Sequence, residues 1–187
     1  MICKLWPGAT KQAEVAKRTD TDVLSIASFK RPQGYEPFTT FLSKQETKAA
    51  NSVLMHARSL NNGIDSIDIL GIEYPSIIDQ RTMIAFQKQS CGIIRSSYRT
   101  HHIQFTELIK PPLFFGKERA LVTQYNISNQ YTNRVRYSVI TSCKRWILRI
   151  DVEVNNSPLT KIKTIAQLEP YGTSVLRVLS SSWIWRD

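Results

Sequence analysis

Apolar and polar residues alternate along most of the second half of the chain, with the two-residue period typical of β-strands. This pattern predicts four strands, at 102–109, 119–127, 134–141 and 145–154. The last two runs are separated by only a few residues, so we expect them to form an antiparallel hairpin. Shorter apolar runs predict three further strands, at 23–29, 66–72 and 175–179.

The first half of the chain contains two segments in which apolar residues recur every three or four positions, as on one face of a helix. The first predicted helix covers 44–61, where Ser43 and Glu46 have the spacing of a capping box. The second covers about 77–95, following Ser76. A third, short helix begins after Ser157-Pro158 and ends at Pro170 and Gly172.

Together these elements predict an α+β fold, with two N-terminal helices packed on a largely antiparallel sheet and a short C-terminal helix. The polar residues 1–22 are predicted to form a flexible arm, and 23–187 a single domain. The N-terminus lacks the apolar run of a signal peptide, and no window is apolar enough to span a membrane. We therefore expect a soluble, intracellular protein.

Positive charge is concentrated in one part of this basic chain, whose formal net charge is +10. The segment 95–149 contains ten basic residues and only two acidic ones, Glu107 and Glu118. Such a concentration of like charge favours an anionic partner: nucleic acid, a nucleoprotein or an anionic membrane surface. The predicted polyanion-binding residues are Arg95, Arg99, Lys110, Lys117, Arg119, Arg134, Arg136, Lys144, Arg145 and Arg149.

The alternation in the predicted hairpin sorts its side chains onto two faces. One face would hold four arginines, and the other would form the core with Val135, Tyr137, Trp146, Leu148 and Ile150. Because the aromatic residues fall opposite the cations, contact with a nucleic-acid backbone is expected rather than stacking on bases. The four arginines are Arg134, Arg136, Arg145 and Arg149.

Catalytic and metal-binding patterns are not found in the sequence, so we predict a protein that is not an enzyme and has no cofactor. Cys3, Cys91 and Cys143 lack the spacing of a zinc site or a disulfide framework, and there is no phosphate-binding glycine loop. Asp151 and Glu153 share one strand face, as in some metal-dependent nucleases. We favour ion pairs with nearby arginines for these two carboxylates and keep a nuclease as an alternative.

The terminal residues Trp183, Ile184 and Trp185 form an apolar tail that should dock on its own domain or on a second copy. We predict self-association through these residues, which would give a homo-oligomer.

The basic character, the low glycine content and the element order resemble those of matrix proteins of negative-strand RNA viruses. That resemblance implies a structural role that bridges nucleoprotein and membrane. Residues 1–40 lack the proline-rich motif that animal rhabdovirus matrix proteins often carry, and no binding residue follows from the likeness. The leading hypothesis is a polyanion-binding protein of this viral, matrix type. The main alternative is a regulatory RNA- or DNA-binding protein, such as a silencing suppressor or a movement protein.

Overall fold

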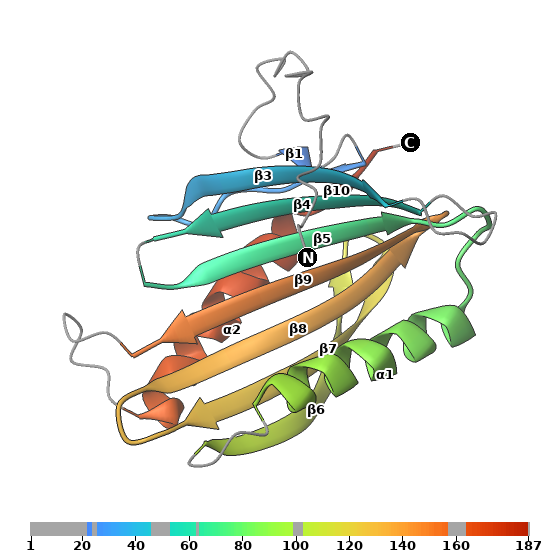
Figure 1. The fold of residues 1–187 in the computed structure, drawn as a ribbon. Coiled ribbons are helices and arrows are strands. Elements are labelled where there is room, and N and C mark those ends of the chain that lie inside the picture. Colours follow the sequence, from blue (N-terminus) through green and yellow to red (C-terminus); the bar gives the residue numbers. More distant parts are fainter. Residues whose placement is uncertain are drawn as a thin grey trace, which may run out of the picture.

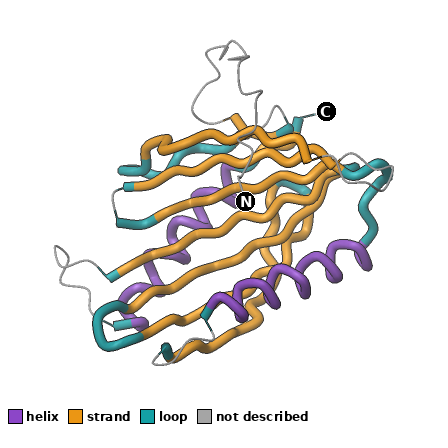
Figure 2. Tube along the Cα trace, viewed as in Figure 1, coloured by secondary structure: helices purple, strands orange, loops and turns teal. Residues whose placement is uncertain are grey.

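A computed structural model describes residues 22–23, 26–45, 53–62, 64–98, 103–156 and 164–186. Within these residues the chain forms a seven-stranded antiparallel sheet with a helix on each face (Figures 1 and 2). The strand order is β3-β4-β5-β9-β8-β7-β6. The strands are β3 (Glu36–Gln45), β4 (Val53–Asn61), β5 (Ser66–Glu73), β6 (Gln104–Phe115), β7 (Glu118–Ser128), β8 (Asn133–Cys143) and β9 (Trp146–Asn155).

The predicted fold class is wrong in the first half of the chain, where strands replace the first helix. Of the segment 44–61, the first two residues lie in β3 and 53–61 form β4, which pairs antiparallel with β3 on one side and with β5 on the other. The residues between them lie outside the described part of the chain. The periodicity was ambiguous because residues such as Leu60 fit a helical stripe and one strand face equally well. Leu60 is fully buried in the core next to Ile67 and Ile69 of β5, so tertiary burial decided the conformation.

The predicted helix at 77–95 corresponds to α1 (Gln80–Ser97), which lies in the middle of the element order and not near the N-terminus. Its N-cap is Asp79, whose side chain accepts a hydrogen bond from the Thr82 amide at 2.7 Å. Buried residues of α1, including Met83 and Ile94, pack on the face of β7, β8 and β9 that the helix covers. One sheet face is thus covered in part by α1.

The opposite sheet face is covered by α2 (Ile165–Ser182). Thr164 and Gln167 form a capping box at its start, whereas the predicted cap at Ser157 lies outside the described residues. The prediction that the helix stops at Pro170 is wrong, and so is the prediction of a strand at 175–179. A proline here removes one backbone hydrogen bond, and burial of Leu168, Leu176 and Leu179 under the sheet outweighs this loss.

A second, small sheet joins the two ends of the described chain. It consists of β1 (Asp22–Val23), β2 (Ala27–Ser28) and β10 (Ile184–Trp185), in that order. The first two replace the single strand predicted at 23–29. Trp183 is only 3% exposed and stacks on Phe29, with 5.5 Å between ring centroids. The apolar tail is therefore packed on its own domain in part, while Ile184 remains 64% exposed.

Two groups of consecutive antiparallel strands make up the large sheet. One group is β3-β4-β5, the other is β6-β7-β8-β9, and α1 connects them. The groups meet at the pairing of β5 with β9, which runs from Ser66 opposite Glu153 to Glu73 opposite Trp146. This pairing lies at the centre of the sheet (Figure 1).

Candidate polyanion interface

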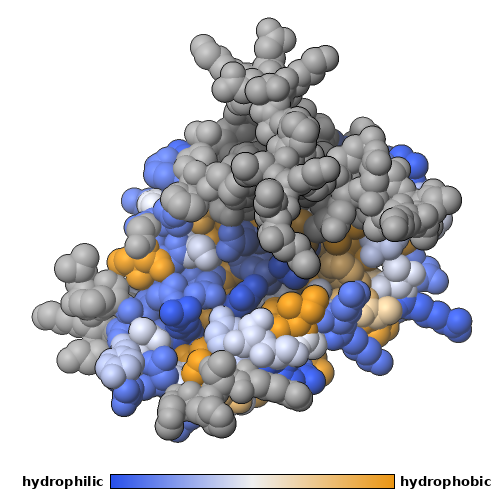
Figure 3. Space-filling view, in the orientation of Figure 1, coloured by the Kyte–Doolittle hydropathy of each residue, from blue (hydrophilic) through white to orange (hydrophobic). Residues whose placement is uncertain are grey.

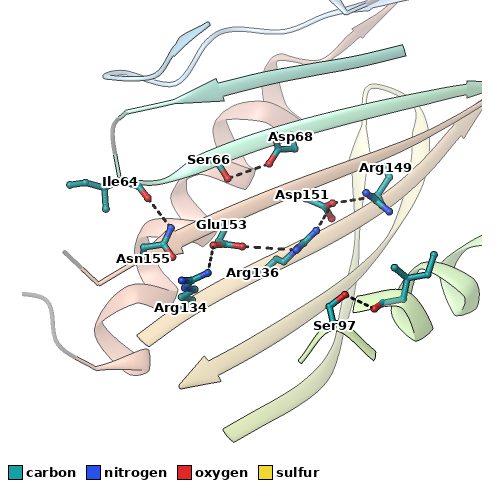
Figure 4. A network of polar contacts seen from close by, with 11 residues as sticks. Ile64, Ser66, Asp68, Ser97, Arg134, Arg136, Arg149, Asp151, Glu153 and Asn155 are labelled. Atoms are coloured by element: carbon teal, nitrogen blue, oxygen red, sulfur yellow. Dashed lines mark hydrogen bonds and ion pairs between the residues drawn. The ribbon is translucent and has the colours of Figure 1, made fainter. Parts of the chain in front are cut away.

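Three of the four arginines predicted on one face of the hairpin do lie together, on the sheet face that carries α1. Arg134 and Arg136 are on β8, and Arg149 is on β9, in the register that places them on one side. Each of them makes an ion pair with a carboxylate of β9 (Figure 4). The alternation that groups the arginines also brings Asp151 and Glu153 to this face, so two carboxylates offset most of the charge of the three arginines.

The distances define a compact charge cluster, which we call the β8–β9 cluster (Arg134, Arg136, Arg149, Asp151 and Glu153). An Oδ2 atom of Asp151 lies 2.8 Å from Nη2 of Arg136 and 3.0 Å from Nε of Arg149. Glu153 Oε1 lies 3.4 Å from Nη1 of Arg134. Asp151 is only 3% exposed. Figure 3 shows hydrophilic residues across the middle of this face of the molecule.

The electrostatics of Arg136 show that the cluster is held internally. Its burial by itself lowers the pKa of the guanidinium, but the Asp151 and Glu153 carboxylates more than reverse this effect, so the pKa of Arg136 is raised overall. The guanidinium is therefore bound to its carboxylate partners and is not offered as a bare charge. This geometry also supports the interpretation of Asp151 and Glu153 as ion-pair partners. Among the described residues, no group of three or more His, Cys, Asp or Glu could hold a metal.

The remaining predicted cations differ in their placement. Arg95 pairs with Glu107 at 2.7 Å, and Lys110 pairs with Glu169 at 2.9 Å. Arg145 does not join the charge cluster of the other three arginines and lies in the turn directly before β9. Its guanidinium lies 2.7 Å from Glu73 of β5. Arg99, like His101 and His102, falls outside the described residues.

The three predicted cations that remain, Lys117, Arg119 and Lys144, lie at one end of the sheet. The β6–β7 turn at Gly116-Lys117 and the β8–β9 turn at Lys144-Arg145 are at the same end, because each connects two strands in the same sense. Lys117, Arg119, Lys144 and Arg145 are all exposed. Lys144 has a φ of 53°, a left-handed conformation that closes the tight two-residue turn.

The C-terminal strand β10 packs against the same end of the sheet. The Trp185 indole Nε1 donates a hydrogen bond of 2.7 Å to the Phe115 carbonyl, directly before the β6–β7 turn. Gly116 has a φ of 61°, and a Cβ there would lie 3.1 Å from Trp185 Cδ1. A glycine thus fits both the turn and the close approach of the indole. Arg186 follows Trp185 and adds a further cation, which the sequence interpretation did not include.

A pocket of about 240 Å³ lies between β10 and the β8–β9 turn. We call the five cations around this end of the sheet the basic end: Lys117, Arg119, Lys144, Arg145 and Arg186. The carboxylates of Glu73 and Glu118 belong to the same region. The pocket is lined by Ile26, Cys143, Lys144, Arg145, Trp146, Trp185 and Arg186.

The placement of Trp146 was predicted correctly in one respect and misinterpreted in another. It does point away from the arginines of the β8–β9 cluster, toward the side of the sheet that faces α2 and β10. However, it lines the pocket together with Lys144 and Arg145, so aromatic and cationic side chains do meet at the basic end. The sequence Lys144-Arg145-Trp146, in which the three residues follow directly on one another at a turn, was the signal that could have indicated this.

Comparison with known proteins does not connect the chain to a family. No family model matches it, and no curated protein matches it. A solved X-ray structure of an uncharacterized protein from Mycobacterium smegmatis is similar over 81% of this chain and 80% of that chain, at 9% sequence identity and a TM-score of 0.39. A likeness at this level carries no functional argument, so the function is argued from the site. None of the described helices is both long enough and apolar enough to cross a membrane.

Proposed function

We propose that this protein is a non-enzymatic module that binds a polyanion through the basic end of its sheet. The observation that carries this proposal is the grouping of five cations at one end of the sheet, on two hairpin turns, at the start of β7 and directly after β10. Three of them, Lys144, Arg145 and Arg186, also line the pocket. Among the described residues, the carboxylates of Glu73 and Glu118 lie in the same region, so positive charge dominates there. A surface of this kind attracts an extended anion and raises its local concentration.

The proposed contact surface lies at the end of the sheet, and not on the sheet face where the sequence predicted it. Arginines of the β8–β9 cluster are in contact with buried or half-buried carboxylates, so a ligand would have to displace Asp151 or Glu153 to reach them. At the basic end, the Arg145 guanidinium pairs with Glu73 of β5 at 2.7 Å. The Arg145 side chain is 54% exposed, and an exposed pair of this kind contributes little energy and is easily exchanged for a ligand phosphate.

Charge reversal at the basic end tests the proposal. In the double variant Lys117→Glu/Lys144→Glu, we expect fluorescence anisotropy to show much weaker binding of labelled heparin, a polyanion without bases. The matched control is Lys88→Glu/Arg177→Glu, which changes the net charge equally at exposed positions on the two helices. Wild-type affinity should fall steeply with salt, with a log–log slope of up to about 3.5 to 4.5 if all five cations neutralise a charge.

Two results would contradict the proposal. One is a wild-type protein whose heparin affinity is absent or independent of salt. The other is an equal loss of affinity in the control variant, which would mean that net charge alone is responsible and that the basic end has no special part.

A further inference from the structure

We infer that the pocket at the basic end takes up an unpaired base of a single-stranded nucleic acid, with its neighbouring phosphates on Lys144, Arg145 and Arg186. This inference rests on the proposed function and makes its ligand specific. Two indoles and three cations line one small pocket. Flat aromatic walls beside cations are the combination that proteins use to stack bases while holding the backbone of a single strand.

Trp185 is held rigidly in this pocket wall. Its Nε1 donates to the Phe115 carbonyl, and its ring meets the Trp183 ring edge to face, with centroids 5.6 Å apart and an angle of 66° between the ring planes. Trp183 in turn stacks on Phe29 and is buried in the core. An indole fixed in this way loses little conformational entropy when a ring packs on it, so its surface is prepared for binding.

Trp146, which also lines the pocket, is the first residue of β9 and is positioned by the pairing of that strand. The backbone there is held by the pairing of Trp146 with Cys143 across the turn and with Glu73 of β5. The side chain is only half-buried, so part of the indole is accessible from the pocket. The two turn cations Lys144 and Arg145 precede it directly, which keeps positive charge next to the aromatic surface.

The size of the pocket favours a single planar group. A volume of about 240 Å³ is below the roughly 300–1,000 Å³ of sites for drug-sized ligands. A base within a duplex is stacked on its neighbours and cannot enter such a pocket without being flipped out, whereas a base of a single strand is available. A simple polyanion would use the cations but would not stack on the two indoles.

Replacing Trp146 separates base stacking from charge. We expect Trp146→Leu to weaken the binding of a labelled oligothymidylate by about tenfold, because stacking on one aromatic ring is lost. Heparin affinity should not change, since the cations remain. Trp146→Phe, which keeps an aromatic ring, should recover most of the affinity for the oligonucleotide. The matched control is Tyr131→Leu, an 80% exposed aromatic in the β7–β8 turn at the opposite end of the sheet.

The outcomes distinguish this inference from the proposed function. If Trp146→Leu and Trp146→Phe bind oligothymidylate as wild type does, while Lys117→Glu/Lys144→Glu weakens both ligands, the base pocket is refuted and polyanion binding stands. An equal loss for heparin and oligothymidylate in Trp146→Leu also refutes base stacking, because the ring then acts only by supporting the turn. Wild-type binding of oligothymidylate without any binding of heparin would refute the general polyanion proposal instead.

Discussion

Gly172 in the middle of α2 allows a sharp test of how the helix packs on the sheet. The residue is buried, and a Cβ added there would be in steric overlap with Cε2 of Tyr137, 3.1 Å from Cδ2 of the same ring and 3.3 Å from Cγ2 of Val154. Tyr137 has little room to move, because it is 1% exposed and its hydroxyl lies 3.2 Å from both the Glu169 carbonyl and Thr173 Oγ1. The variant Gly172→Ala therefore forces the helix away from β8.

Two opposing effects set the magnitude for Gly172→Ala. Alanine in a helix interior is more favourable than glycine by about 1 kcal/mol. Overpacking of a well-packed core costs about 1–3 kcal/mol, and here the nearest atoms belong to a ring that cannot rotate away, so the upper part of this range applies. The free energy of unfolding should fall by roughly 1–2 kcal/mol, which lowers Tm by about 2–8 °C for a chain of this size.

Gly92 provides the matched control, because it is also an interior helix glycine but has no atom within 4 Å of an added Cβ. Gly92→Ala should raise the free energy of unfolding by up to about 1 kcal/mol, since only the helix preference changes. Both variants can be measured by urea unfolding followed by circular dichroism. If Gly172→Ala is as stable as Gly92→Ala, the close contact between α2 and Tyr137 does not exist as described.

Two further predictions concern charged groups. Asp151→Asn should lower the free energy of unfolding by roughly 2–4 kcal/mol in a urea titration, because two partly buried guanidiniums lose their counter-charge. Arg145→Ala removes an exposed ion pair and should change the free energy of unfolding by less than about 1 kcal/mol. Equal effects of the two substitutions would contradict the buried character of the Asp151 pairs. The hydrogen bond from Thr82 lowers the pKa of Asp79 below its ordinary value of 3.8. The ionised cap therefore stabilises the fold fully at pH values above 3.8, and this stabilisation is lost as the pH falls through the lowered pKa. The Tm difference between wild type and Asp79→Ala should thus be constant near neutral pH and shrink in acid, and a difference independent of pH would refute the charged cap.

The strands of the second half were predictable from sequence because their two faces have different chemistry. Along β8 and β9, alternate residues such as Val135, Tyr137 and Ile150 are buried on one side. The residues between them face the other side and are mostly polar, apart from Ile140 and Ile147, which lie under α1. A two-residue period of this kind is specific for a strand. The antiparallel hairpin followed from the short connection, and the pairing of β8 with β9 confirms it.

Other elements could not be predicted because long-range packing decides them. Leu60 fits a helical or an extended pattern, and only its contact with strands elsewhere in the chain selects the strand. Pro170 and Gly172 usually end a helix, yet here α2 continues because the glycine lets it lie against Tyr137. At the candidate site, charge counting along the sequence found the cations but could not show which of them meet carboxylates.

The pairing of β5 with β9 has a consequence for how the chain folds during synthesis. This pairing joins segments that are far apart in the sequence. The contacts of Glu73 with Arg145 and of Asp65 with Asn155 span 72 and 90 residues of the chain. Contacts of such high sequence separation form slowly, because a long loop must close before they contribute. Until β9 has emerged from the ribosome, the edge of β5 has unpaired backbone groups that can pair with the wrong strand. We therefore expect nascent chains that stop before residue 146 to be the aggregation-prone species of this protein.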